Sequence, residues 1–270
     1  LSLPDSGRII HMTPEMSLET QKIIGADIIM AFDQCTPDDC TKDLAGYIMQ
    51  RTHRWLKQSI DYHQAHPTSI YGNRQALFGI IQGGIYTDLR RESADFVTSS
   101  AVDGVAIGGE TIGFDMENTV KVIRDIYDFL PESRPRYSMG VGMSPQDLLD
   151  VVAEGIDMFD CVAPTRNARH GALYCGKTVK SANWLRFASD YENGRIQIKK
   201  AVFANDLSPI MDDCGCYTCR HYSRAFLHHT FKQKTNLFTA LASIHNIHVL
   251  HAVCAKMRDL ILTNCLKEEL

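Results

Sequence analysis

The segment 155–171 places one carboxylate, Asp160, inside a short apolar run, and Arg166 and Arg169 follow within ten residues. The run has the length of a strand and is bounded by glycine and proline. A strand buried on both faces rarely tolerates an unpaired aspartate, so we expect Asp160 near the carboxyl end of the strand, facing a cavity. The arginines indicate either an anionic ligand such as phosphate or a structural ion pair with Asp160. The pattern alone favours neither interpretation.

Three cysteines lie within six residues in the stretch Cys214-Gly-Cys216-Tyr-Thr-Cys219, and His245 lies 26 positions beyond Cys219. Thiolates prefer soft or borderline metals, and Cys3His is a common closed tetrahedral set for zinc. A predicted helix over 222–241 would carry His245 back to the cysteines. Four protein ligands leave no open position for a substrate, so the predicted site is structural. The alternatives are reduced, buried thiols, or a site completed by another histidine among His221, His228, His229 and His248.

Strands and helices alternate along the part of the chain that must position these residues. Strands, each followed by a polar or glycine-rich corner, are predicted at 26–32, 76–81, 104–107, 136–139 and 156–162. Helices are predicted at 17–25, 44–64, 88–99, 116–130 and 144–154. This alternation is typical of a parallel α/β fold.

Polar residues at the carboxyl ends of successive strands favour a (β/α)8 barrel among the parallel α/β folds. Asp33 directly follows the strand at 26–32, and Gln82 follows the strand at 76–81. A doubly wound open sheet is the alternative, but such a sheet usually gathers its ligand at one switch point. We therefore predict the barrel, although these five strands and a sixth predicted at 196–202 fall two short of its eight.

Composition excludes several classes of protein. The 270 residues carry a net charge of −4 and are 44% hydrophobic, which argues against a surface coated in positive charge for indiscriminate nucleic-acid binding. No stretch approaches the roughly 18 uninterrupted apolar residues of a membrane span, and residues 1–7 do not resemble a secretory signal. Nine cysteines, an odd and irregularly spread number, favour cytosolic chemistry with a metal site over a disulfide framework.

Beyond Gly171 the alternation loosens. The stretch 174–195 is rich in lysine and arginine, and 196–202 alternates like a final strand. A basic stretch is usually a solvated face, but its position after Arg166 and Arg169 makes a contact to a nucleic-acid backbone equally plausible.

Taken in order, several motifs resemble the tRNA-guanine transglycosylase family, also called queuine tRNA-ribosyltransferase, and the bacterial type most closely. The resemblance runs from about Pro14 to Leu260 and depends on the order and spacing of the motifs. These are A-F-D-Q-C-T-P at 31–37, F-G-I-I-Q-G-G at 78–84, A-I-G-G at 106–109, Y-S-M-G-V-G at 137–142, the segment 155–171, C-G-C-Y-T-C at 214–219 and Y-S-R-A-F-L-H-H at 222–229.

The resemblance implies a (β/α)8 TIM barrel with a C-terminal zinc-binding subdomain. Residues 1–205 would form the barrel from strands 3 to 8 of the family, and 206–270 the zinc-binding subdomain and C-terminal helices. The first two strands, and a second catalytic aspartate that handles protons, would lie on a segment before this chain. Family members of the bacterial type are cytoplasmic homodimers that carry structural zinc.

The family exchanges guanine at the wobble position of tRNAs with a G-U-N anticodon for a 7-deazaguanine, preQ1 or queuine, without breaking the backbone. By resemblance, Asp160 is the nucleophile that attacks ribose C1′, giving a covalent glycosyl-enzyme that the incoming base resolves. Asp33 matches the carboxylate that accepts the guanine N1–H and amino group. The remaining matches are Gln82 and the Gly109 amide as donors to the guanine carbonyl, Tyr137 and Met139 as the residues that sandwich the base, and Arg166 and Arg169 as contacts to the anticodon loop.

Three departures from the family stand out. Glu110 replaces the usual apolar residue where the 7-substituent of the incoming base would lie, Gln34 replaces a glutamate, and 175–196 is longer than in bacterial members. A carboxylate at position 110 would favour a cationic aminomethyl group or reshape the pocket for queuine. The alternatives to an active enzyme are a non-catalytic tRNA-binding subunit and an inactive truncated form of the same family.

Overall fold

A computed structural model describes residues 5–181 and 184–263 of the chain. The chain divides into two compact units. The first contains residues up to Met139 together with Glu154–Met158, and the second contains Gly140–Ala153 and the residues from Phe159 onward. Three of the segments discussed above lie partly outside the described residues. They are 1–7, 175–196 and 206–270.

The first unit is built from helix–strand repeats that begin at α1 (Pro14–Ile24). Thr13 caps this helix by accepting the Met16 N–H, and Gly25 ends it in the left-handed conformation at φ 81°. The helix therefore begins three residues before the predicted start at 17, because Pro14 fits the first turn. Strand β1 (Ile28–Met30) is shorter than the predicted 26–32.

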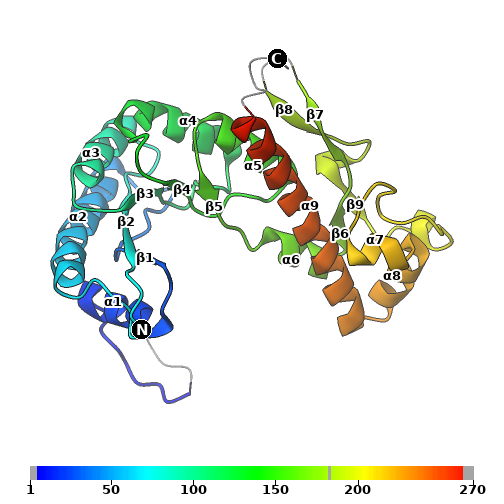
Figure 1. The fold of residues 1–270 in the computed structure, drawn as a ribbon, viewed down its shortest axis with the longest axis horizontal. Coiled ribbons are helices and arrows are strands. Elements are labelled where there is room, and N and C mark those ends of the chain that lie inside the picture. The colour runs from blue at the N-terminus through cyan, green and yellow to red at the C-terminus, as the bar shows by residue number, and fades with distance from the viewer. Residues whose placement is uncertain (1–4, 182–183, 264–270) are drawn as a thin grey trace. The chain divides into compact units, whose positions relative to one another are not determined.

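A five-stranded sheet runs in the order β1-β2-β3-β4-β5, so neighbours in the chain are neighbours in the sheet (Figure 1). The register of each pair from β1 to β4 is parallel, which confirms the predicted parallel α/β fold. The other strands are β2 (Ala76–Ile81), β3 (Gly104–Ile107), β4 (Arg136–Ser138) and β5 (Met158–Phe159). In the described part of the chain the sheet is open, with β1 and β5 at its edges, so a closed barrel is not seen.

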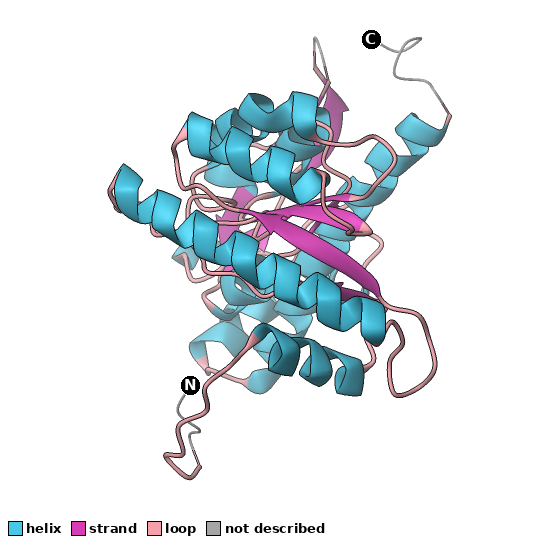
Figure 2. Cartoon of the chain, turned by 90° about the vertical axis from the view of Figure 1, so that its left-hand side faces the viewer, coloured by secondary structure: helices cyan, strands magenta, loops and turns pink. Residues whose placement is uncertain are grey.

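Helices connect the strands, and those of the first unit cover the sheet (Figure 2). They are α2 (Lys42–Ala65), α3 (Thr87–Thr98), α4 (Met116–Ile126), which continues as the short 3-10 helix η1 (Tyr127–Phe129), and α5 (Pro145–Ala153). Helices α2 and α3 pack on β2 and on each other. The strand side chains Leu77, Ile81 and Val105 are at most 1% exposed, so the apolar runs that predicted β2 and β3 form the core.

The second unit combines short antiparallel strand pairs with helices. Strand β6 (Ala172–Tyr174) pairs with β9 (Arg195–Gln197), and β7 (Lys177–Lys180) pairs with β8 (Leu185–Ala188). The final strand predicted at 196–202 is therefore wrong in extent. Of these residues, only Ile196 and Gln197 belong to β9, which pairs antiparallel outside the five-stranded sheet. Residues 198–200 form a turn, and 201–202 begin the 3-10 helix η3 (Ala201–Phe203). A second 3-10 turn, η2 (Glu192–Gly194), precedes β9.

Three helices follow, namely α7 (Tyr217–His221), α8 (Arg224–Lys232) and α9 (Asn236–Leu262). The single helix predicted over 222–241 is wrong, because the chain turns at Lys234 (φ 53°) and Thr235 caps a new helix by accepting the Phe238 N–H. His245 consequently lies within α9 itself. By length and composition α9 would suffice to cross a membrane. It packs instead against α5, α6 (Ala163–Arg169), α7 and α8 within its unit, as a core helix does.

Candidate functional site

The residues matched to base recognition all belong to the first unit and lie at one edge of its sheet. Asp33 follows β1, Gln82 follows β2 and Gly109 follows β3. Tyr137 lies in β4 and Met139 follows it. Because these strands are parallel neighbours, their carboxyl ends form one edge, where α/β proteins usually bind ligands.

A buried hydrogen-bond network joins the ends of β1 and β2. Gln82 is 0% exposed, and its Nε2 donates to Asp33 Oδ2 over 2.7 Å. Its Oε1 accepts from the Thr36 amide at 3.3 Å and the Thr36 hydroxyl at 3.0 Å. These partners fix which end of the Gln82 amide faces Asp33 and leave Nε2 a second hydrogen for a ligand. Burial raises the pKa of Asp33, although the bond from Gln82 acts in the opposite direction.

Thr36 is a member of this network that the sequence reasoning did not single out. It lies in the A-F-D-Q-C-T-P motif and is 1% exposed. Its only signal in the sequence is its position three residues after Asp33. Nothing there indicates that its hydroxyl orients a side chain from the next strand.

The glycine pair after β3 is required by close packing. A side chain at Gly108 would lie 2.8 Å from Gln82 Nε2, and Met139 Sδ is 3.5 Å from the same point. Gly109 has a φ of +123°, and a side chain there would lie 2.8 Å from Nη2 of Arg90. Only glycine both adopts this positive φ and avoids the contact with Arg90. No side chain at position 109 therefore covers the backbone there.

Glu110 contacts the loop that follows β1. The Asp38 amide donates to Glu110 Oε2 at 3.4 Å, and the Glu110 amide donates to the Thr36 carbonyl at 3.3 Å. The Thr111 hydroxyl donates to Asp38 Oδ1. Two carboxylates thus gather beside the glycine pair, and burial together with Asp33 and Glu110 raises the pKa of the nearby Cys35 thiol.

Asp160 lies in the second unit, directly after β5, and is exposed. Its Oδ1 accepts from the Gly140 amide at 3.2 Å. It lines a cavity of about 360 Å³ whose other walls include Val141, Leu148 and Cys161. This agrees with the expectation of a carboxylate at a strand end that faces a cavity.

Arg166 and Arg169 occupy the last turn of α6 (Ala163–Arg169), and both side chains are exposed. Residues three apart share one face of a helix, so the two guanidinium groups are presented on one side. The basic hairpin of β7 and β8 belongs to the same unit and exposes Lys177 and Arg186. These side chains suit phosphate groups more than a small planar ligand.

The four predicted metal ligands come together in the second unit. The ligand atoms of Cys214, Cys216, Cys219 and His245 all lie within 4.8 Å of one another. The Cys214, Cys216 and Cys219 sulfurs lie 3.8, 3.5 and 3.3 Å from His245 Nδ1. Three thiols and one imidazole at these separations fit a closed structural zinc site. None of the competing histidines belongs to this cluster, within the residues described.

A backbone group outside the cluster orients His245. Its Nε2 lies 2.7 Å from the Tyr174 carbonyl, which can only accept, so Nε2 carries the hydrogen and the Nδ1 lone pair faces the thiols. Cys216 also caps α7, since its sulfur accepts the Cys219 N–H at 3.3 Å. The fold thus holds the imidazole in the tautomer that a metal requires.

Comparison with known proteins gives one consistent result. The family model for queuine tRNA-ribosyltransferase matches residues 2–270. A queuine tRNA-ribosyltransferase from Dechloromonas aromatica is 40% identical over 260 residues, covering 96% of this chain and 64% of the relative. Those from Idiomarina loihiensis and a Nostoc species are 41% and 40% identical, covering 95% and 98% of this chain and 62% and 65% of the relatives.

The chain therefore spans a little under two thirds of the length of these relatives. The match nonetheless covers both compact units and all the candidate sites. These are Asp160, the Cys3His cluster, and the corner at the strand ends that is formed by Asp33, Gln82, Gly109, Tyr137 and Met139. This chain belongs to the queuine tRNA-ribosyltransferase family.

Proposed function

We propose that this chain is the catalytic part of an enzyme that exchanges guanine at the wobble position of G-U-N tRNAs for a 7-deazaguanine. Family membership supports the reaction class. The observation that carries the proposal is the pair formed by half-buried Asp33 and buried Gln82, joined at 2.7 Å beside the glycine backbone at the ends of β1, β2 and β3. A carboxylate acceptor beside amide donors complements the N1–H, amino and carbonyl edge of guanine.

In this proposal each group of the corner has one role. Asp33 accepts from the guanine N1–H and amino group, while the second Nε2 hydrogen of Gln82 and the Gly109 amide donate to the guanine carbonyl. Tyr137 and Met139 flank the ring, the one by aromatic contact and the other through its polarisable sulfur. Burial of Gln82 strengthens its hydrogen bonds, because a low local dielectric weakens competition from water.

Asp160 is the proposed nucleophile. Its carboxylate attacks ribose C1′, the bond from C1′ to guanine N9 breaks, and a covalent ribosyl–aspartate ester remains. N9 of the incoming deazaguanine then attacks C1′ and releases Asp160, so two inversions retain the configuration, as in a retaining glycosidase. The phosphate backbone is never cleaved. The departing guanine takes up one proton and the incoming base gives up its N9 proton, so the exchange consumes no net proton.

The tRNA is proposed to contact the second unit. Arg166 and Arg169 present two exposed guanidinium groups on one helix face, and the β7–β8 hairpin adds further exposed basic residues. Contacts of this kind bind phosphates and position the anticodon loop, while the base corner reads the flipped guanine.

The wider architecture completes the proposal. The chain order of the five strands lacks the reversal of a doubly wound sheet and supports part of a (β/α)8 barrel. The divisions 1–205 and 206–270, the homodimer and the cytoplasmic location stay predictions. Zinc, held by Cys214, Cys216, Cys219 and His245, would be structural and would supply no chemistry to the reaction.

The test is incorporation of labelled guanine into a G-U-N tRNA. We expect incorporation by the protein and background counts from Asp160→Asn. Asp61→Asn, which alters an exposed carboxylate on α2, is the matched control and should exchange normally. Tight tRNA binding with equal, background counts from all three proteins would instead support the non-catalytic subunit. Preparations that bind neither tRNA nor base would support the inactive truncated form.

A further inference from the structure

Arg90 is a completely buried arginine on α3, at 0% exposure. Arginines are rarely buried unless they pair with a carboxylate, because desolvating the charge is costly. No ion pair to Arg90 occurs among the residues that the structure describes. Burial lowers the pKa of Arg90 to about 10, so the guanidinium is still charged at neutral pH. A charge kept in the core at this cost calls for an explanation.

The Arg90 guanidinium binds backbone carbonyls at the ends of two strands. Nη1 donates to the Ile81 carbonyl at 3.0 Å and to the Gly108 carbonyl at 2.7 Å, and Nε donates to the Gly84 carbonyl at 2.6 Å. The Ile81 and Gly84 carbonyls flank Gln82 after β2, and the Gly108 carbonyl follows β3. One rigid, planar side chain therefore ties together the two strand ends proposed to bind the guanine carbonyl.

The bond to Gly108 sets the direction of the Gly109 amide. The carbonyl of Gly108 and the N–H of Gly109 belong to one planar trans peptide, so they point in opposite directions. With the carbonyl held by Arg90, the N–H must point away from the guanidinium. A hydrogen bond from a cation also polarises that peptide and makes its N–H a stronger donor.

A second residue of α3 completes the same arrangement at Gln82. The Gln82 amide donates to Ser93 Oγ at 3.1 Å, while the carbonyl of the same peptide, that of Ile81, accepts from Arg90. Both ends of the Ile81–Gln82 peptide are therefore held by side chains three residues apart on α3. Its plane has no freedom to rotate without breaking a buried hydrogen bond.

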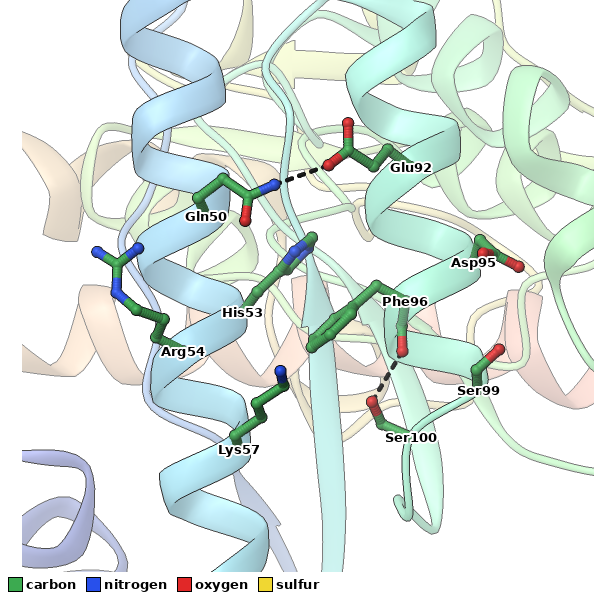
Figure 3. Close-up of a pocket in the computed structure, with 9 residues that line it drawn as sticks. All are labelled: Gln50, His53, Arg54, Lys57, Glu92, Asp95, Phe96, Ser99 and Ser100. Atoms are coloured by element: carbon green, nitrogen blue, oxygen red, sulfur yellow. Dashed lines mark hydrogen bonds between the residues drawn. The ribbon is translucent and has the colours of Figure 1, made fainter.

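His53 on α2 holds the Ser93 hydroxyl. Its Nε2 lies 3.0 Å from Ser93 Oγ, and its ring stacks on Phe96 at 4.1 Å between centroids (Figure 3). Burial and nearby Lys57 lower the pKa of His53 to about 4, so the ring is neutral. Ser93 Oγ therefore hydrogen-bonds both the Gln82 amide and the His53 ring. The outer side of His53 lines a cavity of about 460 Å³ between α2 and α3.

We propose that Arg90 is a positioning residue for base recognition: by holding the Ile81–Gln82 and Gly108–Gly109 peptides, it aims the two donors that meet the 6-carbonyl of the base. The inference rests on the proposed function. Arg90 does not touch the base. Its direct hydrogen bonds lie on the side of the 6-carbonyl donors, and Asp33, which meets the N1–H and amino group, receives none from it.

Base analogues separate this role from general support of the fold. In 6-thioguanine a sulfur, which is a weak acceptor, replaces the 6-oxygen, while N1–H and the amino group remain. Equilibrium dialysis with labelled guanine and 6-thioguanine gives a ratio of affinities that does not depend on the fraction of folded protein. The protein should prefer guanine. In Arg90→Met we expect guanine affinity to fall roughly tenfold and the ratio to approach 1.

Two further variants sharpen the test. Arg90→Lys keeps a cation that can reach some of the carbonyls, so its ratio should lie between those of the protein and Arg90→Met. Arg91→Met, at an exposed neighbour whose Nε bonds the Asp125 carbonyl, is the matched control and should keep the full preference. If Arg90→Met fails to fold, Ser93→Ala, which frees one end of the Ile81–Gln82 peptide, should lower the ratio by a smaller factor.

The outcomes distinguish this inference from the proposed function. If the unaltered protein does not bind guanine, the base-recognition role of the corner is wrong. If it binds and prefers guanine, but Arg90→Lys and Ser93→Ala keep its full preference, Arg90 is a structural residue only and the present inference is overturned.

Discussion

The two compact units differ in how they hold the side chains assigned to function. In the first unit, Gln82 is buried and its amide and peptide groups are held by Thr36, Ser93 and Arg90. In the second unit, Asp160, Arg166 and Arg169 are exposed. A small planar base must be recognised by a few preset donors and acceptors, whereas a large polyanion is bound by many adaptable contacts. The difference is what the proposed exchange of one base of a tRNA would need.

The second unit gains its order in another way. His245 and Asn246 are adjacent on α9, and both are 0% exposed. His245 belongs to the Cys3His cluster, while Asn246 donates to the carbonyls of Pro164 and Ala172 at 3.0 Å each. The cluster therefore fixes the helix that in turn holds α6, the element carrying both arginines. The first unit depends on buried hydrogen bonds, and the second on the Cys3His cluster.

Removal of the metal should produce the largest difference between the two units. Binding of structural zinc contributes about 10 kcal/mol or more in small domains. Treatment with a chelator should therefore unfold the second unit and abolish tRNA binding, while guanine binding by the first unit persists. Metal analysis should find about one zinc per chain beforehand. A protein that keeps its full thermal stability and tRNA affinity after complete metal removal would contradict this account.

Asp33→Asn should affect the first unit alone. Replacing the carboxylate by an amide loses a charged acceptor and presents a donor to the guanine N1–H. The cost should be about 3 kcal/mol, or roughly a hundredfold in guanine affinity. Dialysis measures the base, and filter binding measures the tRNA, whose affinity should change less than about twofold if phosphate contacts dominate it. An equal loss of both affinities would show that the units are not functionally separate.

Arg166→Ala and Arg169→Ala should affect the second unit alone. Removing one phosphate contact should reduce the slope of log affinity for tRNA against log salt by about 0.7 to 1. Guanine affinity should stay unchanged. Lys177→Ala, on the exposed face of the β7–β8 hairpin, tests whether the hairpin also contacts the backbone. Unchanged salt slopes in both arginine variants would remove α6 from the tRNA interface.

The smallest expected effect is a pH dependence of base binding. Asp33 must be ionised to accept from guanine, and burial raises its pKa. Lowering the pH should therefore weaken guanine binding at a higher pH than an ordinary aspartate would, with full affinity restored above the raised pKa. In Asp33→Asn this loss of guanine affinity at low pH should disappear. If guanine affinity still falls at low pH in that variant, a group other than Asp33 is responsible.

The buried strands were predicted well from the sequence, whereas the point where one helix ends and the next begins was predicted poorly. Strands 76–81 and 104–107 have the predicted bounds, because uninterrupted apolar runs ending in glycine leave few alternatives. The break between α8 and α9 was missed because Lys234, not glycine or proline, takes the positive φ. The capping signal of Thr235 was present but stood inside a helical pattern.

The site was predictable where residue type alone decides the chemistry. Three clustered thiols and a distant histidine indicated a metal, and the structure brings those four together. Arg90 was invisible, because an arginine in the stretch D-L-R-R-E reads as part of an exposed helix face, and only the tertiary fold shows which of two adjacent arginines is buried. The same holds for Thr36, whose partner lies 46 residues away.

The central claim, base exchange through Asp160, is tested most directly by trapping the covalent intermediate. The protein is mixed with a labelled G-U-N tRNA and denatured, and the products are separated on a denaturing gel. We predict a protein–tRNA adduct that disappears when excess guanine is added before denaturation, and no adduct with Asp160→Asn. Guanine exchange at an undiminished rate by Asp160→Asn, or an adduct formed by that variant, would contradict the account.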